Sequence, residues 1–271
     1  MGYIGVEMKT AVNGINIAYD DHGIGLPVFF LHAFPLNRGM WEGEMRALLQ
    51  DERYRLVALD WRGLGESDIT SDVSTMEMFA DDVAGLMDAL GVSQAVLCGL
   101  SMGGYAAFAF LRKYPERVGG LVLADTRPGA DTAEGRANRE NVARIALEDG
   151  TRAIADLQMP KLISDYTRQN HAEVEARVRQ MIDAATQQGI AAASRGMAQR
   201  ADSSDLLSMI SCPTLVVAGE QDALIPASTQ QEYAARIPGA QFSVIPYAGH
   251  LANLEQPEAF VQVLRGFLGS L

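Results

Sequence analysis

One serine of the chain is surrounded by glycines in a way that could support nucleophilic chemistry. Ser101 is the centre of the stretch GLSMG (residues 99–103), and a further glycine follows directly. The apolar residues 94–98 before it predict a short strand, and residues 105–114, rich in Ala, Phe and Leu, predict a helix. Glycines at such a turn would hold the serine at its apex. Ser101 is then either a helix N-cap or a nucleophile, and partners elsewhere in the chain must decide.

A serine hydroxyl is a weak nucleophile that needs an adjacent base, and the base needs a group that orients it. The chain has four histidines. We expect His22 in a turn and His171 at the start of a polar helix. His32 follows the strand predicted at 28–31 and is expected to be a structural hydrogen-bond donor. His250 follows a strand that ends at residue 245, and catalytic groups gather beyond the carboxyl ends of parallel strands. His250 is therefore the candidate base, with a backbone-bonded loop histidine as the alternative.

Three aspartates could orient this base. Asp222 lies in the loop after the strand predicted at 214–218, where an aspartate can also serve as a turn residue. Asp125 and Asp60 end strands too and are rivals. We expect Asp60 to anchor its own glycine-containing loop, with Arg62 as a nearby ion-pair partner. Asp222 is the preferred candidate.

The surrounding elements predict a sheet that brings these residues together. Four short runs, at 28–31, 56–59, 95–98 and 121–124, are apolar throughout, as is typical of parallel strands buried on both faces. A helix with one apolar face lies between the second and third runs and opens on the capping box of residues 74–77. Alternation of this kind predicts βα units. Residues 6–21, with Asn13-Gly14 at their centre, predict a β-hairpin.

Residues 128–205 break this alternation with several helical patterns and no convincing strand. Strands return at 214–218 and 242–245, and a helix from Pro257 closes the chain. The simplest organisation is a core formed by residues 1–127 and 206–271, with residues 128–205 inserted as a helical cap.

At this point the sequence resembles the α/β-hydrolase fold family. The stretch GLSMG matches its nucleophile elbow, G-x-S-x-G, and the order Ser101, Asp222, His250 is the family's order. The resemblance extends to HAFP at 32–35, where Ala33 replaces the commoner glycine, and to the loop 60–67. It implies a mostly parallel, twisted sheet of about eight strands flanked by helices, with a helical cap. It also implies a Ser-His-Asp triad and an oxyanion hole formed by the backbone N–H groups of Phe34 and Met102.

The resemblance implies a serine carboxylesterase that cleaves small carboxylic esters through an acyl-enzyme. An enol-lactonase of the 3-oxoadipate type is the alternative, and the carboxylate of its substrate would need a cation. Arg127, Arg195 and Arg200 are candidates for this cation, and solvated surface charge is the role that their residue type favours. Further possible functions are those of a perhydrolase, a carbon–carbon bond hydrolase and a hydrolase-like receptor with slow turnover. An apolar pocket could be lined from the cap by Met159, Met181, Met197, Leu157, Leu162 and Ile190, although each of them, taken alone, is better explained as a residue that packs a core.

Composition argues against nucleic acid and membranes as partners, and the resemblance implies a small-molecule ester or lactone substrate. The 271 residues include 34 acidic and 22 basic side chains, a net charge of −12 that opposes binding to nucleic acid or anionic membranes. No apolar run approaches the ~20 residues that a membrane span needs. Residues 1–9 show no targeting signal, and the two cysteines form no CxxC pair, so we expect a cytoplasmic protein. No cofactor and no metal is expected, and the sequence indicates no oligomeric state.

Overall fold

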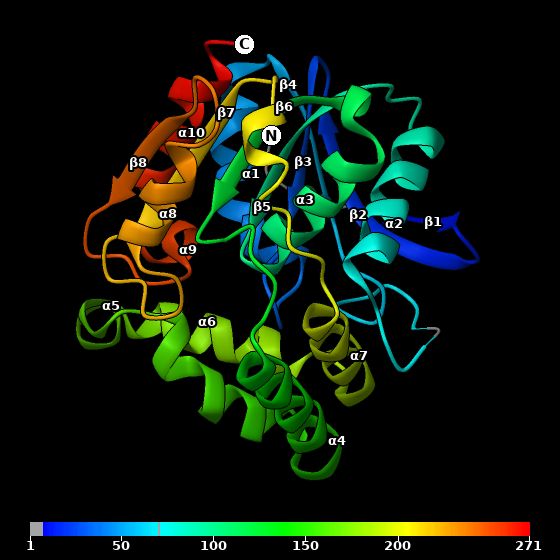
Figure 1. Ribbon diagram of the computed structural model, residues 1–271, viewed down its shortest axis with the longest axis vertical. Coiled ribbons are helices and arrows are strands. Elements are labelled where there is room, and N and C mark those ends of the chain that lie inside the picture. Colours follow the sequence, from blue (N-terminus) through cyan, green and yellow to red (C-terminus); the bar gives the residue numbers. More distant parts are fainter. Residues whose placement is uncertain (1–7, 70) are drawn as a thin grey trace.

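The computed structural model describes residues 8–69 and 71–271, and these residues form a single sheet of eight strands (Figure 1). The strand order is β1-β2-β4-β3-β5-β6-β7-β8. The first two strands run antiparallel to each other, β2 is antiparallel to β4, and all remaining neighbours are parallel. The predicted mostly parallel sheet of about eight strands is confirmed. The strands are β1 (Met8–Val12), β2 (Ile15–Gly23), β3 (Leu26–Leu31), β4 (Tyr54–Leu59), β5 (Ala95–Leu100), β6 (Val118–Ala124), β7 (Thr214–Gly219) and β8 (Gln241–Ile245).

The predicted hairpin is present from Met8 onward. Asn13 and Gly14 connect β1 to β2 with φ values of 50° and 80°, the positive values that a tight two-residue turn requires. Val6, with which the predicted hairpin begins, lies outside the described residues. The same holds for residues 1–7 of the N-terminal segment 1–9, which shows no targeting signal. The prediction that His22 lies in a turn is wrong, because β2 continues to Gly23 and pairs His22 with Leu56 of β4.

Helices cover both faces of the sheet. On one face, an aromatic series joins Phe30 of β3 to Trp41 and then to Phe260, with ring centroids 5.2 and 6.1 Å apart. Side chains alternate along a strand, so Leu31 points to the opposite face, where Gly103 of helix α3 packs closely on it. The helices outside residues 133–198 are α1 (Glu42–Leu48), α2 (Met76–Ala89), α3 (Met102–Lys113), α8 (Ala227–Ala234), α9 (Ala252–Glu255) and α10 (Pro257–Leu268).

The start of α2 corrects one prediction. The cap residue is Thr75, whose hydroxyl accepts a hydrogen bond from the Met78 N–H, and not Ser74 as the capping-box pattern predicts. The backbone of Ser74 is engaged instead by helix α7, since its N–H donates to the Ala192 carbonyl. A long-range contact therefore moves the helix start by one residue.

Between β6 and β7 the described chain contains helices and no strand, as predicted. These helices are α4 (Ala133–Leu162), which is interrupted at Gly150, α5 (Asp165–Asn170), α6 (Ala172–Asp183) and α7 (Gln187–Ala198). They lie together below the sheet in Figure 1, on the side where β5 meets α3. We call residues 133–198 the cap. The division of the chain into a core and an inserted cap stays a prediction.

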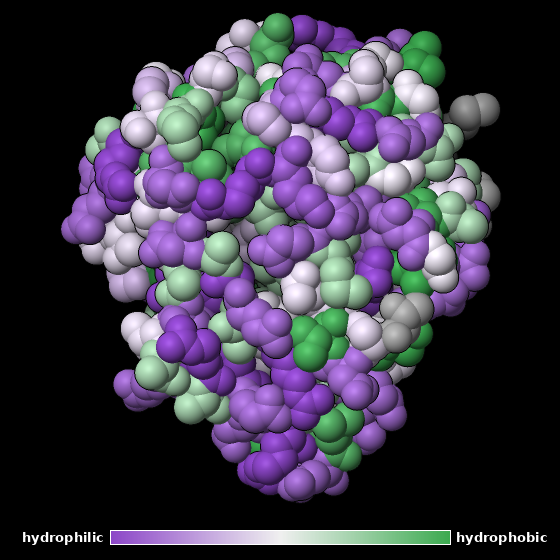
Figure 2. All heavy atoms as spheres, turned by 45° about the vertical axis from the view of Figure 1, so that its right-hand side comes forward, coloured by the Kyte–Doolittle hydropathy of each residue, from purple (hydrophilic) through white to green (hydrophobic). Residues whose placement is uncertain are grey.

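The face of the molecule shown in Figure 2 carries no obvious concentration of one residue kind. On the face shown in Figure 2, hydrophilic residues are interspersed with separate hydrophobic ones. In the part of the chain that the structure describes, no helix combines the length and apolar character that crossing a membrane requires.

Candidate active site

The turn between β5 and α3 holds Ser101 in an unusual conformation. Its φ is 55° and its ψ is −111°, which are sparsely populated values for a residue with a side chain. The Ser101 N–H donates to the Ala124 carbonyl of β6 at 2.9 Å, and its carbonyl accepts from the Thr126 hydroxyl at 2.8 Å. A Cβ on Gly99 would lie 2.4 Å from the Gly103 carbonyl oxygen, so the crossing of strand and helix leaves no room for a side chain there. The glycines permit the turn, as predicted.

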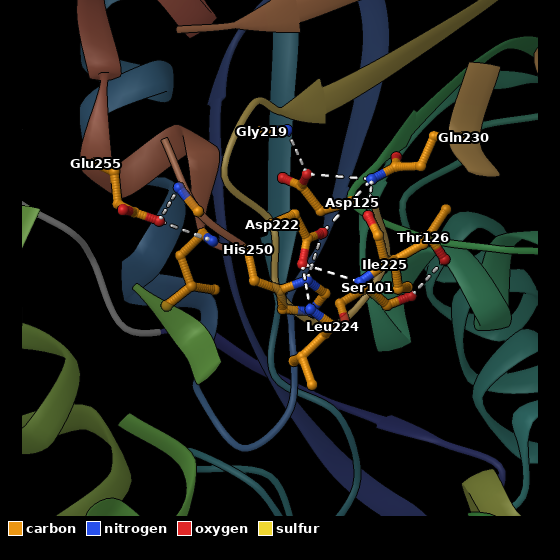
Figure 3. A network of polar contacts seen from close by, with 12 residues as sticks. Ser101, Asp125, Thr126, Gly219, Asp222, Leu224, Ile225, Gln230, His250 and Glu255 are labelled. Carbon is orange, nitrogen blue, oxygen red and sulfur yellow. Dashed lines mark hydrogen bonds and ion pairs between the residues drawn. The ribbon is translucent and has the colours of Figure 1, made fainter. Parts of the chain in front are cut away.

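Ser101, His250 and Asp222 form a continuous series of hydrogen bonds (Figure 3). The Ser101 Oγ lies 2.8 Å from His250 Nε2, and His250 Nδ1 lies 2.9 Å from Asp222 Oδ2. The second carboxylate oxygen, Oδ1, accepts from the Leu224 and Ile225 N–H groups at 2.8 and 3.0 Å. Asp222 is therefore both a turn residue and the partner of the imidazole. Because the carboxylate only accepts, Nδ1 carries the proton and Nε2 is left to accept from the serine.

The surroundings of His250 favour its charged form. Burial of the ring opposes the positive charge, but the neighbouring Asp222 carboxylate outweighs it, and the pKa of His250 is raised. An imidazole that is stabilised when protonated is suited to accepting a proton from a hydroxyl group.

The rival aspartates have other partners. Asp125, at the end of β6, accepts from the Gly219 N–H at 2.7 Å, and no hydrogen bond joins it to the imidazole among the described residues. Burial and the nearby Asp222 charge raise the pKa of Asp125 well above its usual value, which favours the neutral acid. Asp60 does anchor its own loop, because it accepts from the Glu66 N–H at 2.9 Å. Its ion-pair partner is Arg38 and not Arg62 as predicted, since Arg62 pairs with Asp82 of α2 instead.

The remaining histidines lie outside the serine's surroundings. His32 is buried, its Nε2 accepts from the Trp61 N–H at 3.1 Å, and its Nδ1 lies 2.9 Å from the Ala33 carbonyl oxygen. Burial lowers the pKa of His32 to about 3, so the ring is neutral and acts as the predicted structural donor. His171 lies at the exposed junction of α5 and α6 and contacts Glu173.

Two backbone N–H groups beside Ser101 are available to a ligand. Met102 is the first residue of α3, where the helix leaves its N–H groups unpaired and the dipole favours negative charge. Among the described residues, neither Met102 nor Phe34 donates its N–H to another group. The Phe34 loop is fixed by His32 and by a hydrogen bond from the Ala33 N–H to the Met40 sulfur at 3.2 Å. Ala33 fits this loop because its φ is not positive.

A cavity of about 190 Å³ opens above Ser101 and His250. The prediction of an apolar lining from the cap is wrong for four of its six residues, since Leu162 and Met197 line the cavity and Met159, Met181, Ile190 and Leu157 do not. Those four pack into the hydrophobic core, because the cap helices bury their apolar faces against each other and against the sheet. A helical pattern indicates which face is apolar and not what covers it.

Charged side chains form part of the cavity lining, beside apolar ones. Arg127, Arg139 and Lys161 line it, together with Asp131, to which both arginines are bonded at 3.0 and 3.1 Å. Arg127 is thus the one predicted cation that reaches the site. Arg195 pairs with Glu140 at 2.8 Å on the surface, and Arg200 is buried in an ion pair with Asp131, also at 2.8 Å. Lys161 forms no ion pair with any described residue.

Three residues near the site escaped the sequence interpretation. Thr126 bonds the serine turn, Gln230 lies behind Asp222 and Asp125, and Glu255 contacts the histidine loop (Figure 3). None of them forms a local motif, because the partners of each include a residue far away in the chain. The five-residue spacing of Glu255 from His250 is the single sequence signal that could have drawn attention to it.

A sheet of this order with a serine turn after β5 defines a hydrolase-type α/β architecture. A family model for the alpha/beta hydrolase fold matches residues 27–257, and the chain belongs to this family. The predicted family, fold and hydrolase class are confirmed at this level.

Individual relatives cover almost the whole chain. An esterase from Thermogutta terrifontis, solved with malate bound, is 46% identical with a TM-score of 0.93, over 97% of this chain and 98% of its own. An enol-lactonase from Burkholderia xenovorans LB400 is 27% identical with a TM-score of 0.89, over 97% and 100%. The chain is also 31% identical to 3-oxoadipate enol-lactonase 1 of Acinetobacter baylyi, over 90% of this chain and 89% of that protein.

Proposed function

We propose that the protein is a serine hydrolase that cleaves small carboxylic esters through an acyl-enzyme. One observation carries this proposal, the series of hydrogen bonds from Ser101 Oγ to His250 at 2.8 Å and from His250 to Asp222 at 2.9 Å. The strained turn supports it, because backbone strain persists mainly where function uses the exposed side chain.

The proposed reaction has two halves. Ser101 Oγ attacks the ester carbonyl carbon while His250 Nε2 takes the hydroxyl proton, and the protonated imidazole then gives this proton to the departing alcohol. A water molecule, deprotonated in the same way, attacks the acyl-enzyme and releases the acid, and the proton returns to Ser101. Asp222 holds the Nδ1 tautomer and stabilises the imidazolium. The N–H groups of Phe34 and Met102 would bind the oxyanion, and one such donor is typically worth ~3–4 kcal/mol in the transition state.

The size of the cavity favours short acyl chains. Its volume of about 190 Å³ is below the ~300–1,000 Å³ of pockets that take drug-sized ligands. The Thermogutta esterase, at 46% identity, supports esterase activity as the leading function.

A carboxylate-bearing lactone or ester is the second candidate substrate, and the cationic lining of the cavity favours it. Arg127, Arg139 and Lys161 can contact a carboxylate placed above Ser101. The enol-lactonase relatives and the malate bound to the Thermogutta esterase agree with an anionic ligand.

Substrate profiling of the wild type beside Ser101→Ala tests both candidates. We expect turnover of nitrophenyl acetate and butyrate to exceed that of the octanoate, and the substitution to abolish all of it while the melting temperature stays nearly unchanged. Faster turnover of a carboxylated lactone than of every simple ester would favour the second candidate. Undiminished hydrolysis by the Ser101→Ala variant would overturn the serine mechanism.

A further inference from the structure

A single buried carboxylate holds the loop that carries His250. The Oε1 atom of Glu255 accepts from the N–H groups of Gly249 and Leu251, at 2.9 and 3.2 Å. These are the two residues on either side of the histidine. The carboxylate of Glu255 therefore fixes the backbone through which the imidazole is oriented (Figure 3).

The other oxygen of the same carboxylate binds the cap. Glu255 Oε2 accepts from the Ser164 N–H at 2.8 Å and from the Thr167 hydroxyl at 2.7 Å. Both residues belong to the start of α5, and both are buried. A carboxylate has about four lone-pair positions, and here four donors occupy them. All four donors are uncharged, so dipoles rather than a cation balance the buried negative charge.

Further contacts join the same two segments. The Ser164 hydroxyl donates to the Tyr247 carbonyl at 2.9 Å, and the Leu251 N–H also approaches the Leu162 carbonyl at 3.1 Å. The backbones are so close that a Cβ on Gly249 would lie 2.6 Å from the Ser164 nitrogen. The histidine loop and the first turn of α5 thus form one hydrogen-bonded unit with Glu255 at its centre.

We propose that Glu255 is a positioning residue that couples the placement of His250 to the docking of the cap segment Ser164–Thr167. The inference rests on the proposed function, since it assigns His250 the role of base. If this coupling holds, the cap has a second role besides forming a wall of the substrate cavity. A change in the cap that touches no substrate alters the chemical step through Glu255.

The charge of Glu255 adds an electrostatic effect on the same imidazole. Burial opposes the charged imidazolium, Asp222 supports it most strongly, and Glu255 also raises the pKa of His250. Replacing Glu255 by glutamine would remove this negative charge as well as one of the acceptor atoms.

The first test uses Thr167, which is fully buried and does not line the substrate cavity. Thr167→Val keeps the size of the side chain and removes the donor to Glu255, whereas Thr167→Ser keeps the donor. With ethyl butyrate, we expect Thr167→Val to lower kcat roughly tenfold, as for the loss of a hydrogen bond to a charged group, with KM within about twofold. Thr167→Ser should stay within about twofold of the wild type, so the conservative variant rescues the rate.

The second test compares Glu255→Gln with Glu258→Gln, an exposed glutamate three residues away. Rates are normalised to active sites titrated with a fluorophosphonate. Glu255→Gln should lower kcat roughly 10- to 100-fold and move the acidic limb of the pH profile to lower pH. Glu258→Gln should change neither. In the Glu255→Gln background, Thr167→Val should have almost no further effect, because both act through the same contact.

A third measurement does not need turnover. Hydrogen exchange of peptides that span residues 247–256 should speed up in Thr167→Val and not in Thr167→Ser. Unchanged hydrogen exchange in Thr167→Val would overturn the coupling. So would a kcat per titrated site and a pH profile equal to those of the wild type in both Thr167→Val and Glu255→Gln. Either result would count even if the melting temperatures of the variants fell. If Glu255→Gln fails to fold, the Thr167 pair decides alone. An inactive wild type would reject the proposed function, and the exchange comparison would still test the coupling.

Discussion

At the level of single residues, two aspartates behind His250 have opposite surroundings. Asp222 accepts hydrogen bonds from the imidazole, from the Leu224 and Ile225 N–H groups and, at 3.5 Å, from the Gln230 side-chain amide. Asp125 receives one strong hydrogen bond, from Gly219, and its Oδ2 has no partner among the described residues. Two carboxylates this close to one imidazole do not both ionise readily, and burial selects Asp125 as the neutral one.

Asparagine substitutions separate the two roles. In Asp222→Asn, an amide that faces Nδ1 favours the wrong tautomer, and we expect kcat to fall on the order of 10³–10⁴-fold. In Asp125→Asn, an amide replaces a neutral acid of the same shape, and kcat should stay within roughly tenfold of the wild type. Steady-state kinetics with ethyl butyrate measure both. A larger loss in Asp125→Asn than in Asp222→Asn would make Asp125 the orienting acid.

The same variants differ in pH dependence. His250 must be neutral to accept the serine proton, and its raised pKa means that kcat/KM of the wild type falls as the pH drops through a value above 6.5. Without the Asp222 charge, burial dominates and the pKa of His250 decreases, so the acidic limb of Asp222→Asn moves to lower pH. The limb of Asp125→Asn should move less than that of Asp222→Asn, because the raised pKa of Asp125 favours its neutral form.

At the level of elements, the serine turn depends on how closely α3 approaches β3 and β5. A Cβ on Gly103 would lie 2.0 Å from the Leu31 carbonyl oxygen, a backbone atom that cannot move independently. Ser101 keeps its position because β6, α3 and Thr126 all form hydrogen bonds with its backbone. The strain of one residue is thus maintained by the packing of three elements.

Two glycine-to-alanine substitutions in helices should change stability in opposite directions. Gly103→Ala in α3 forces an overlap with backbone and should lower the free energy of unfolding by ~1–3 kcal/mol. Gly266→Ala in α10 meets nothing within 4 Å and should raise it by ~0.5–1 kcal/mol, because alanine restricts the unfolded chain and favours helix. Urea unfolding measures both. Equal changes in the free energy of unfolding for the two variants would show that the close approach of α3 to β3 does not constrain the turn at Ser101.

Local pattern accounts for what the sequence predicted well. Buried strands, the glycine turn at Ser101 and the loop position of His250 follow from residue types within a few positions of each other. Choices that depend on long-range packing were not predictable. Arg38 rather than Arg62 pairs with Asp60, and Glu255 contacts a cap segment nearly 90 residues earlier in the chain, at separations of 91 and 88 residues. No periodicity encodes such contacts.

At the level of the whole molecule, the charge of the cavity differs from that of the protein. The chain carries a net charge of −12, yet Arg127, Arg139 and Lys161 line the space above Ser101. The two arginines share Asp131, whose contacts with Arg200 and Arg139 outweigh its burial and lower its pKa to about 2. Asp131 therefore stays negatively charged and neutralises part of the positive charge of Arg127 and Arg139. Among the described residues that line the cavity, Lys161 is the cation without an ion-pair partner, and it can meet a substrate carboxylate.

Substitution of Lys161 should then discriminate between substrates that differ by one charge. Monoethyl succinate and ethyl butyrate have acyl chains of equal length, and the succinate alone carries a carboxylate. We expect Lys161→Gln to raise KM for monoethyl succinate about tenfold, the effect of losing one charge-assisted hydrogen bond, and to leave ethyl butyrate unchanged. Lys113→Gln is the control, because Lys113 pairs with Asp81 away from the cavity. Added salt should shrink the preference of the wild type, since ~1 M salt screens charges beyond about 3 Å. Equal changes in KM for both esters would mean that Lys161 shapes the cavity without recognising charge.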